Sequence, residues 1–169
     1  MTRLLKSVRL WGAIAALGLL AGAAAVADRS PALALVNESP SLPRGVYLRR
    51  PGAEPGRGAV VAIPQPAAAR PYLAALGMPA DVRLIKRVAG VGGDEVCADD
   101  GVVRTPAGRV RALARDRRGA PLAAWAGCRR LADGELFLLG DTAGSFDSRY
   151  FGPVARSGVD GVYREILTW

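Results

Sequence analysis

The sequence contains no histidine and only two lysines, Lys6 and Lys86, against 21 arginines. Without histidine, a hydrolase of the Ser-His-Asp type is excluded, whereas a serine paired with a lysine base is not. Lys86 is the only lysine in the body of the chain, because Lys6 belongs to the basic N-terminus. Arginine stays protonated at any workable pH, but a buried lysine can lose its proton and act as a base. The scarcity of lysine therefore indicates a special role for Lys86.

Cysteine is nearly as scarce, since Cys97 and Cys128 are the only two. Two cysteines without any histidine make a poor zinc site, and we expect neither a metal nor another cofactor. In an exported protein the pair is expected to form a disulfide, which would contribute on the order of 2–4 kcal/mol. The alternative is two buried free thiols.

The charge is strongly positive, +8 with an isoelectric point of about 10.5. Such a balance favours an acidic neighbour, such as anionic lipid headgroups or an acidic partner, although scattered arginines also suit an ordinary solvated surface. No basic run is interleaved with aromatic residues, so we do not expect nucleic acid as a partner.

A basic N-terminus precedes an uncharged run, residues 10–27. As a helix this run would be about 27 Å long, close to the roughly 30 Å of a bilayer's hydrocarbon core. It is either a retained signal anchor or a cleavable signal peptide that ends at Ala25-Val26-Ala27, which has the small-x-small form. Both readings predict an N-terminal transmembrane or signal helix in residues 1–27. They also predict that residues 28–169 form a domain in the bacterial periplasm, which stays attached to the inner membrane if the helix is retained and is periplasmic if the helix is cleaved.

The rest of the chain reads as a mostly β domain with one or two short helices. A helix is expected at 67–76, with Pro71 in its first turn or breaking it. Residues 28–44 read as an extended loop, and 95–132 as short strands and arginine-rich loops. Glycine- and proline-rich turns separate the remaining strands, which are expected at 45–50, 59–63, 81–91, 135–139 and 159–167.

Lys86 lies in the strand expected at 81–91. Side chains alternate along a strand, so Lys86 shares its face with Leu84 and Val88, while Arg83 and Arg87 point the other way. Burial without a counter-charge lowers a lysine pKa, as a general base at neutral pH requires. The alternative is a lysine whose ammonium group reaches the sheet edge.

Two further segments carry polar side chains. Ser39 and Ser41 lie in a proline-bracketed stretch whose restricted backbone suits a hydroxyl held for attack, or else forms a mere spacer. In the segment 140–152, Ser145 can hydrogen-bond a neutral lysine, and Asp147 can pair with Arg149 to pin the loop. The alternative for that segment is a turn with a surface ion pair.

Together these segments resemble the type I signal peptidase family, the membrane-anchored Ser-Lys endopeptidases. The resemblance covers most of the chain, through the apolar run and three motif segments, 37–47, 83–94 and 140–152. It implies a signal-peptidase-like β domain with Ser41 as nucleophile and Lys86 as general base. It also implies an oxyanion hole from Ser39 and the Ser41 backbone N–H, a lysine oriented by Ser145, and a loop supported by Asp147 and Arg149.

Pro43 lies two residues after Ser41, and Gly45 lies four residues after it. This spacing is similar to that of the conjugative-transfer, TraF-type branch. This similarity implies a serine endopeptidase that processes the pilin subunit of a conjugation or type IV secretion system, by hydrolysis or by cyclisation. Its partners would be an extended peptide of a preprotein or prepilin, the inner membrane and secretion components. The alternatives are a general preprotein signal peptidase and a non-catalytic periplasmic scaffold.

Overall fold

The computed structural model describes residues 31–169 of the chain. The chain divides after Ala32 into two units, and the fold below is that of Leu33–Trp169. The helix predicted within residues 1–27 lies outside the described residues. Within the described part, no helix combines the length and apolar character needed to cross a membrane.

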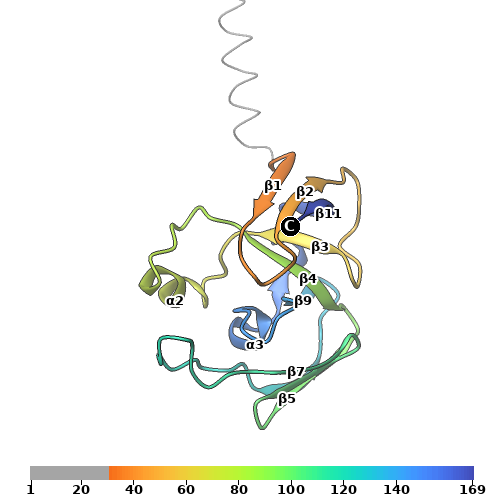
Figure 1. Ribbon diagram of the computed structural model, residues 1–169. Helices are drawn as coiled ribbons and strands as arrows, with labels where there is room; N and C mark the ends of the chain where they lie inside the picture. Colours follow the sequence, from red (N-terminus) through yellow and green to blue (C-terminus); the bar gives the residue numbers. More distant parts are fainter. Residues whose placement is uncertain (1–30) are drawn as a thin grey trace, which may run out of the picture. The chain divides into compact units, whose positions relative to one another are not determined.

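Two antiparallel sheets form the domain (Figure 1). The larger sheet has the order β1-β2-β11-β3-β4-β9-β10, and the smaller has the order β7-β6-β5-β8. Strands of the larger sheet are β1 (Ala34–Asn37), β2 (Gly45–Arg49), β3 (Val60–Ile63), β4 (Leu84–Val91), β9 (Glu135–Leu139), β10 (Val154–Ala155) and β11 (Gly161–Thr168). Strands of the smaller sheet are β5 (Glu95–Asp99), β6 (Val102–Thr105), β7 (Gly108–Arg111) and β8 (Gly127–Arg130).

Three short helical segments complete the described elements: α2 (Arg70–Ala75), α3 (Ser148–Phe151) and the 3-10 turn η1 (Arg156–Gly158). The mostly β class with short helices is confirmed. The helix predicted at 67–76 is shorter than expected, and Pro71 lies in its first turn, where the missing N–H costs nothing. The strand predicted at 135–139 matches β9.

One prediction was wrong, because residues 28–44 are not all loop. Ala34–Asn37 form the edge strand β1, which pairs with β2 in the register Ala34↔Leu48 to Asn37↔Gly45. An edge strand of four residues between proline-rich segments leaves little periodicity to detect. This strand matters for function because its last residue leads into the serine-bearing turn.

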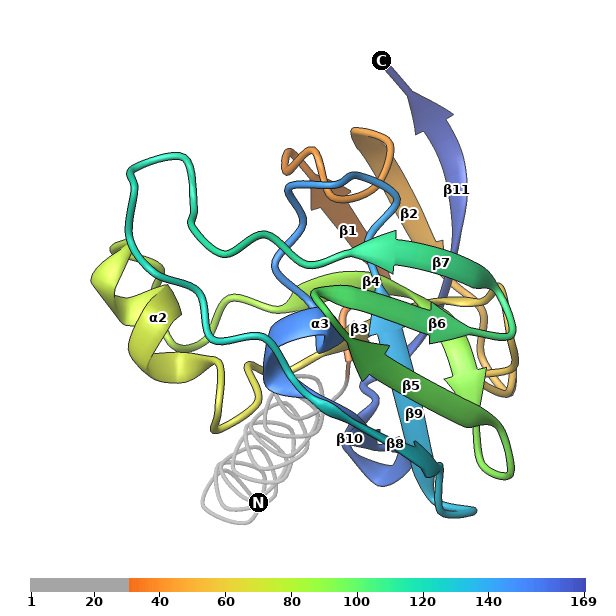
Figure 2. The ribbon, with the colours of Figure 1, turned by 90° about the horizontal axis from the view of Figure 1, so that it is seen from below.

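The two faces of the central strands β4 and β9 pack against different layers. Leu84 and Val88 join Leu136 and Leu138 in one core cluster, which also takes Leu73 of α2. Ala89 and Phe137 belong instead to a second cluster with residues of the smaller sheet, which lies in front of β9 in Figure 2. Strand alternation therefore places Lys86 on the face shared with Leu84 and Val88, the side on which α2 packs.

Cys97 and Cys128 lie opposite each other in the β5–β8 pair, and their sulfur atoms form a disulfide. This bond links β5 to β8, the strand at one edge of the smaller sheet. Neither cysteine lines the cleft described below.

Candidate active site

The turn between β1 and β2 carries both predicted serines. Asn37 ends β1, and Ser39 and Ser41 follow it within four residues. The Oγ atoms of the two serines are 2.8 Å apart, within hydrogen-bond distance. Ser41 is buried, with 7% of its surface exposed, and its hydroxyl lies beside that of Ser39.

Lys86 lies in the middle of β4 and is also buried, 5% exposed. The pKa of its amine is lowered to about 8, mainly by burial and to a smaller extent by the nearby Arg149 charge. Asp147 and Asp141 act in the opposite direction, through their negative charges. A lysine with this pKa is mostly neutral in mildly basic solution and can then accept a proton.

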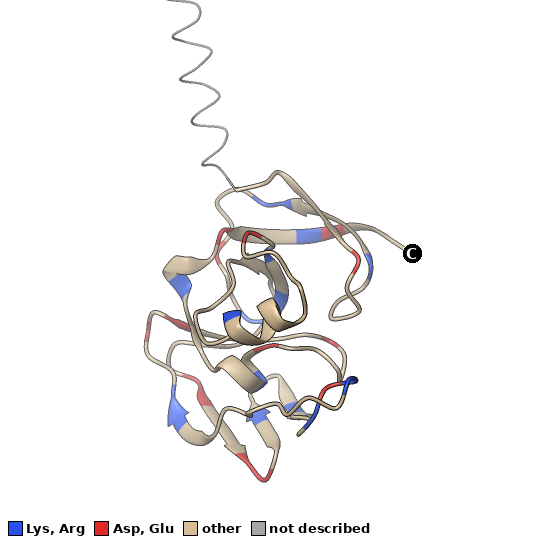
Figure 3. Cartoon of the chain, turned by 90° about the vertical axis from the view of Figure 1, so that its left-hand side faces the viewer, with Lys and Arg blue, Asp and Glu red and all other residues tan. Residues whose placement is uncertain are grey.

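Ser41 and Lys86 line the same cleft, which has a volume of about 520 Å³. Residues 36–39 and 82–85 also line it, together with α2 residues and Phe146. Ser39 and Ser145 lie in this cleft as well, so the structure brings four of the predicted site residues together. Figure 3 views the molecule from the side of α2, and charged residues of both signs are scattered over the cartoon.

The segment 140–152 packs directly on the turn that carries Ser39 and Ser41. The backbone N–H of Asp141 donates a hydrogen bond to the carbonyl oxygen of Ser41 over 2.6 Å. A Cβ atom on Gly140 would collide with Ser145 Oγ and would lie 2.8 Å from the Ser41 carbonyl oxygen. Only glycine fits at position 140 without moving one of these serines.

Asp147 and Arg149 form a fully buried ion pair, with 0% and 1% of their side chains exposed. Arg149 Nε and Nη2 donate to the two Asp147 carboxylate oxygens over 2.8 and 2.7 Å. Asp147 also accepts from the backbone N–H of Gly140, and Arg149 donates to the carbonyl oxygens of Arg111, Thr142 and Ala143. The pair thus connects the start of the segment 140–152, at residues 140–143, to residues 147–149.

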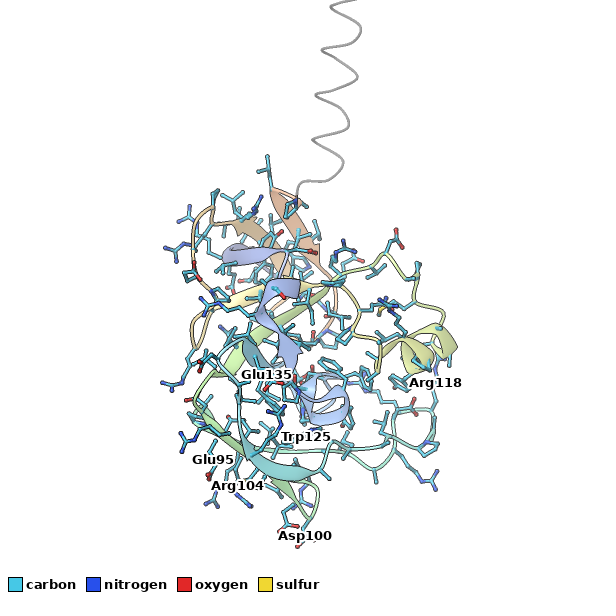
Figure 4. The ribbon with its side chains drawn as sticks, turned by 180° about the vertical axis from the view of Figure 1, so that it is seen from behind. Glu95, Asp100, Arg104, Arg118, Trp125 and Glu135 are labelled. Carbon is cyan, nitrogen blue, oxygen red and sulfur yellow. A yellow bond between two sulfur atoms is a disulfide. The ribbon has the colours of Figure 1, made fainter. Side chains whose placement is uncertain are left out.

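A further hydrogen bond connects the backbone of α3 to the segment that precedes β8. Trp125 N–H donates to the carbonyl oxygen of Arg149 over 2.8 Å, and Trp125 lies beside α3 in Figure 4. The Trp125 ring also packs edge-on against Phe137 of β9. The segment leading to β8 is thereby attached to the loop that carries Ser145.

Ser145 reaches the cleft but does not make the predicted bond to lysine in this structure. Its Oγ atom is buried, and it has no hydrogen-bond partner among the described residues. A buried hydroxyl without a partner is costly, so a role that supplies one is expected. Its orienting role toward Lys86 stays a prediction.

Sequence reasoning missed three residues that build this site. Asn37 is the only asparagine of the chain and is 4% exposed, a scarcity as informative as that of lysine. Gly140 is fixed by the close approach of Ser41 and Ser145. Arg87 holds the Asp141 carboxylate with two hydrogen bonds of 2.9 and 2.8 Å, a pairing between residues 54 positions apart that no local pattern reveals.

Comparison with known proteins identifies the family to which this chain belongs. The family model described as signal peptidase, peptidase S26, matches residues 6–169. A plasmid transfer protein TraF of Escherichia coli is 37% identical over 180 residues, covering 99% of this chain and 97% of the relative. A second TraF of Escherichia coli is 33% identical and covers both chains in full.

A probable conjugal transfer protein TraF of Sinorhizobium fredii is 34% identical, over 79% of this chain and 77% of the relative. A crystal structure of a signal peptidase I from Enterococcus faecalis V583 matches with 26% identity and a TM-score of 0.40, covering 65% of this chain and 97% of that one. The chain therefore belongs to the signal peptidase family, peptidase S26, in its TraF-type branch.

Proposed function

We propose that this protein is a serine endopeptidase in which Ser41 is the nucleophile and Lys86 the general base. The observation that supports this most directly is a buried lysine with a pKa of about 8 in the same cleft as a buried serine. Membership of the peptidase family and the absence of histidine agree with a Ser-Lys pair. In this assignment Asp147 and Arg149 are supporting residues, because they hold the loop and do not contact substrate.

The reaction begins when the neutral Lys86 amine takes the proton of Ser41, whose oxygen attacks the scissile carbonyl carbon. The Ser41 backbone N–H and the Ser39 hydroxyl stabilise the oxyanion of the tetrahedral intermediate, each donor supplying about 3–4 kcal/mol. The protonated Lys86 then gives its proton to the leaving amine, and an acyl-enzyme remains. Ser145 orients the Lys86 amine during both proton transfers.

The acyl-enzyme is released by a nucleophile that enters the same cleft. Water gives a linear product, and the substrate's own terminal amine gives a cyclic one. The cleft walls at residues 36–39 and 82–85 follow the end of β1 and the start of β4. This arrangement suits an extended peptide that adds a strand between them, with a small side chain at the cleavage site.

The relatives named as plasmid or conjugal transfer proteins support a substrate from a conjugation apparatus, namely its pilin precursor. The apolar run 10–27 supports attachment to the inner membrane, with residues 28–169 as a catalytic domain in the periplasm. Enzyme and precursor would then meet in the plane of one membrane.

The test is processing of a co-expressed candidate prepilin by the full-length protein, with the product mass read by mass spectrometry. Ser41→Ala and Lys86→Arg should each lose cleavage by several orders of magnitude, because both groups act as one unit. Lys86→Arg keeps the positive charge and removes the base. Lys6→Arg makes the same exchange at the only other lysine and should cleave normally.

The same experiment separates the competing outcomes. A product lighter by one water molecule than the linear peptide means cyclisation, and the linear mass means hydrolysis. Full activity of Lys86→Arg would contradict the Ser-Lys mechanism and favour a non-catalytic scaffold. Cleavage of unrelated exported preproteins with equal efficiency would favour a general signal peptidase.

A further inference from the structure

The side-chain amide of Asn37 is held in one orientation by its partners. Its Nδ2 atom donates to the carbonyl oxygens of Ser39, Leu42 and Pro43 over 3.0–3.1 Å. Its Oδ1 atom accepts from the backbone N–H and the hydroxyl of Ser39 over 3.2 and 2.8 Å. The opposite orientation would set an acceptor against three carbonyl oxygens, so Oδ1 faces Ser39.

This orientation fixes the positions of the serine protons. A serine hydroxyl has one proton to donate, and Ser39 gives it to Asn37 Oδ1. In the 2.8 Å contact between the two serine hydroxyls, Ser41 must therefore be the donor. The hydrogen bonds run from Ser41 to Ser39 to Asn37. Before substrate binds, neither the nucleophile's proton nor that of Ser39 is placed for catalysis.

We propose that Asn37 is a positioning residue, which acts on the reaction through Ser39 and through the backbone of the turn 39–43. It holds Ser39 Oγ beside Ser41 until a substrate carbonyl arrives. The Ser39 hydroxyl then turns from Asn37 Oδ1 to that carbonyl oxygen, and the proton of Ser41 becomes free for Lys86. This inference rests on the proposed peptidase function, but its first test does not require activity.

The first test uses the side-chain amide signals in the NMR spectrum of the full-length, ¹⁵N-labelled protein. The chain has one asparagine and one glutamine, so Asn37 and Gln65 give the only side-chain carboxamide signals. Ser39→Ala removes the hydroxyl that donates to Asn37 Oδ1. It should therefore shift the pair of NMR signals from the Asn37 side-chain NH2 group. The Gln65 pair should stay in place, because its amide donates to Pro79 and Val82. An unmoved Asn37 pair overturns the proposal.

The second test measures peptide processing by Asn37→Ala. We expect kcat to fall on the order of 10- to 100-fold with a much smaller change in KM, because the serines lose their placement while the other residues that line the cleft remain. Asp94→Ala is the matched control. Asp94 is also buried and organises a turn, by accepting from Val91 N–H and Arg57, but it does not line the cleft.

Asp94→Ala should lose stability. Both variants are assayed well below their unfolding temperatures, so this loss should leave the kcat of Asp94→Ala unchanged. An equal kcat for Asn37→Ala and the wild type overturns the positioning role. The double variant Asn37→Ala/Ser39→Ala should lose less than the product of the two single losses. Losses that multiply would show that Asn37 does not act through Ser39. If the wild type and Ser41→Ala process alike, the peptidase function itself is wrong.

Discussion

The backbone N–H of Asp141 donates to the carbonyl oxygen of Ser41 over 2.6 Å, between residues that lie 100 positions apart in the chain. The turn that carries Ser39 and Ser41 and the loop that follows β9 are thus bonded directly through their backbones. The Arg87 guanidinium holds the Asp141 side chain in addition. Substitutions in this loop should therefore shift the Ser41 hydroxyl even where they do not contact it.

Gly140→Ala should lower both stability and cleavage. The added methyl group meets Ser145 Oγ and the Ser41 carbonyl oxygen, and such overpacking costs about 1–3 kcal/mol. Thermal unfolding and peptide processing measure the two effects. Gly134→Ala is the control, because nothing lies within 4 Å of its added methyl group. Equal behaviour of the two variants would contradict the close packing.

Cleavage should increase as the pH rises through about 8 and then level off, because only the neutral Lys86 amine can accept the Ser41 proton. The profile of kcat/KM against pH reports this pKa in the free enzyme. With no histidine in the chain, no imidazole can produce the same inflection. A profile that is flat or falls through pH 8 would exclude Lys86 as the base.

Lys86→Met should abolish cleavage and yet stabilise the fold near neutral pH. The lysine pKa is 10.5 when unperturbed and about 8 in the folded protein, so below pH 8 the folded state holds an unfavourable buried charge. This corresponds to a cost on the order of 3 kcal/mol, which fades as the pH rises from 8 toward 10.5. Urea unfolding of both proteins at two pH values measures it. A stability difference that does not depend on pH would contradict the buried charge.

Asp147→Asn should destabilise the protein by about 3–5 kcal/mol, because the Arg149 charge stays buried without its counter-charge. Denaturant unfolding gives this value. Glu54→Gln breaks the exposed pair with Arg156 and should change stability by less than about 1 kcal/mol. Similar losses in the two variants would mean that burial of the Asp147–Arg149 pair has no energetic weight.

The sequence predicts much of this fold where the pattern is local. Alternation along 81–91 places Lys86 on one face with Leu84 and Val88. The structure shows both of these apolar side chains in one core cluster. The strand β1 was not predicted, because four edge residues carry too weak a pattern. Asn37 and Gly140 were not predicted either, since their roles come from neighbours that only the folded chain brings close.

The attachment of Arg149 to Arg111 and of Trp125 to the Arg149 carbonyl has a consequence for inserting tags or labels. The stretch between these two anchors, residues 112–124, has both ends fixed to the loop that bears Ser145. Added length there should disturb processing. The tight β6–β7 turn at Pro106 and Ala107 is exposed and lies outside the cleft, so a short epitope placed there should leave the protein able to work.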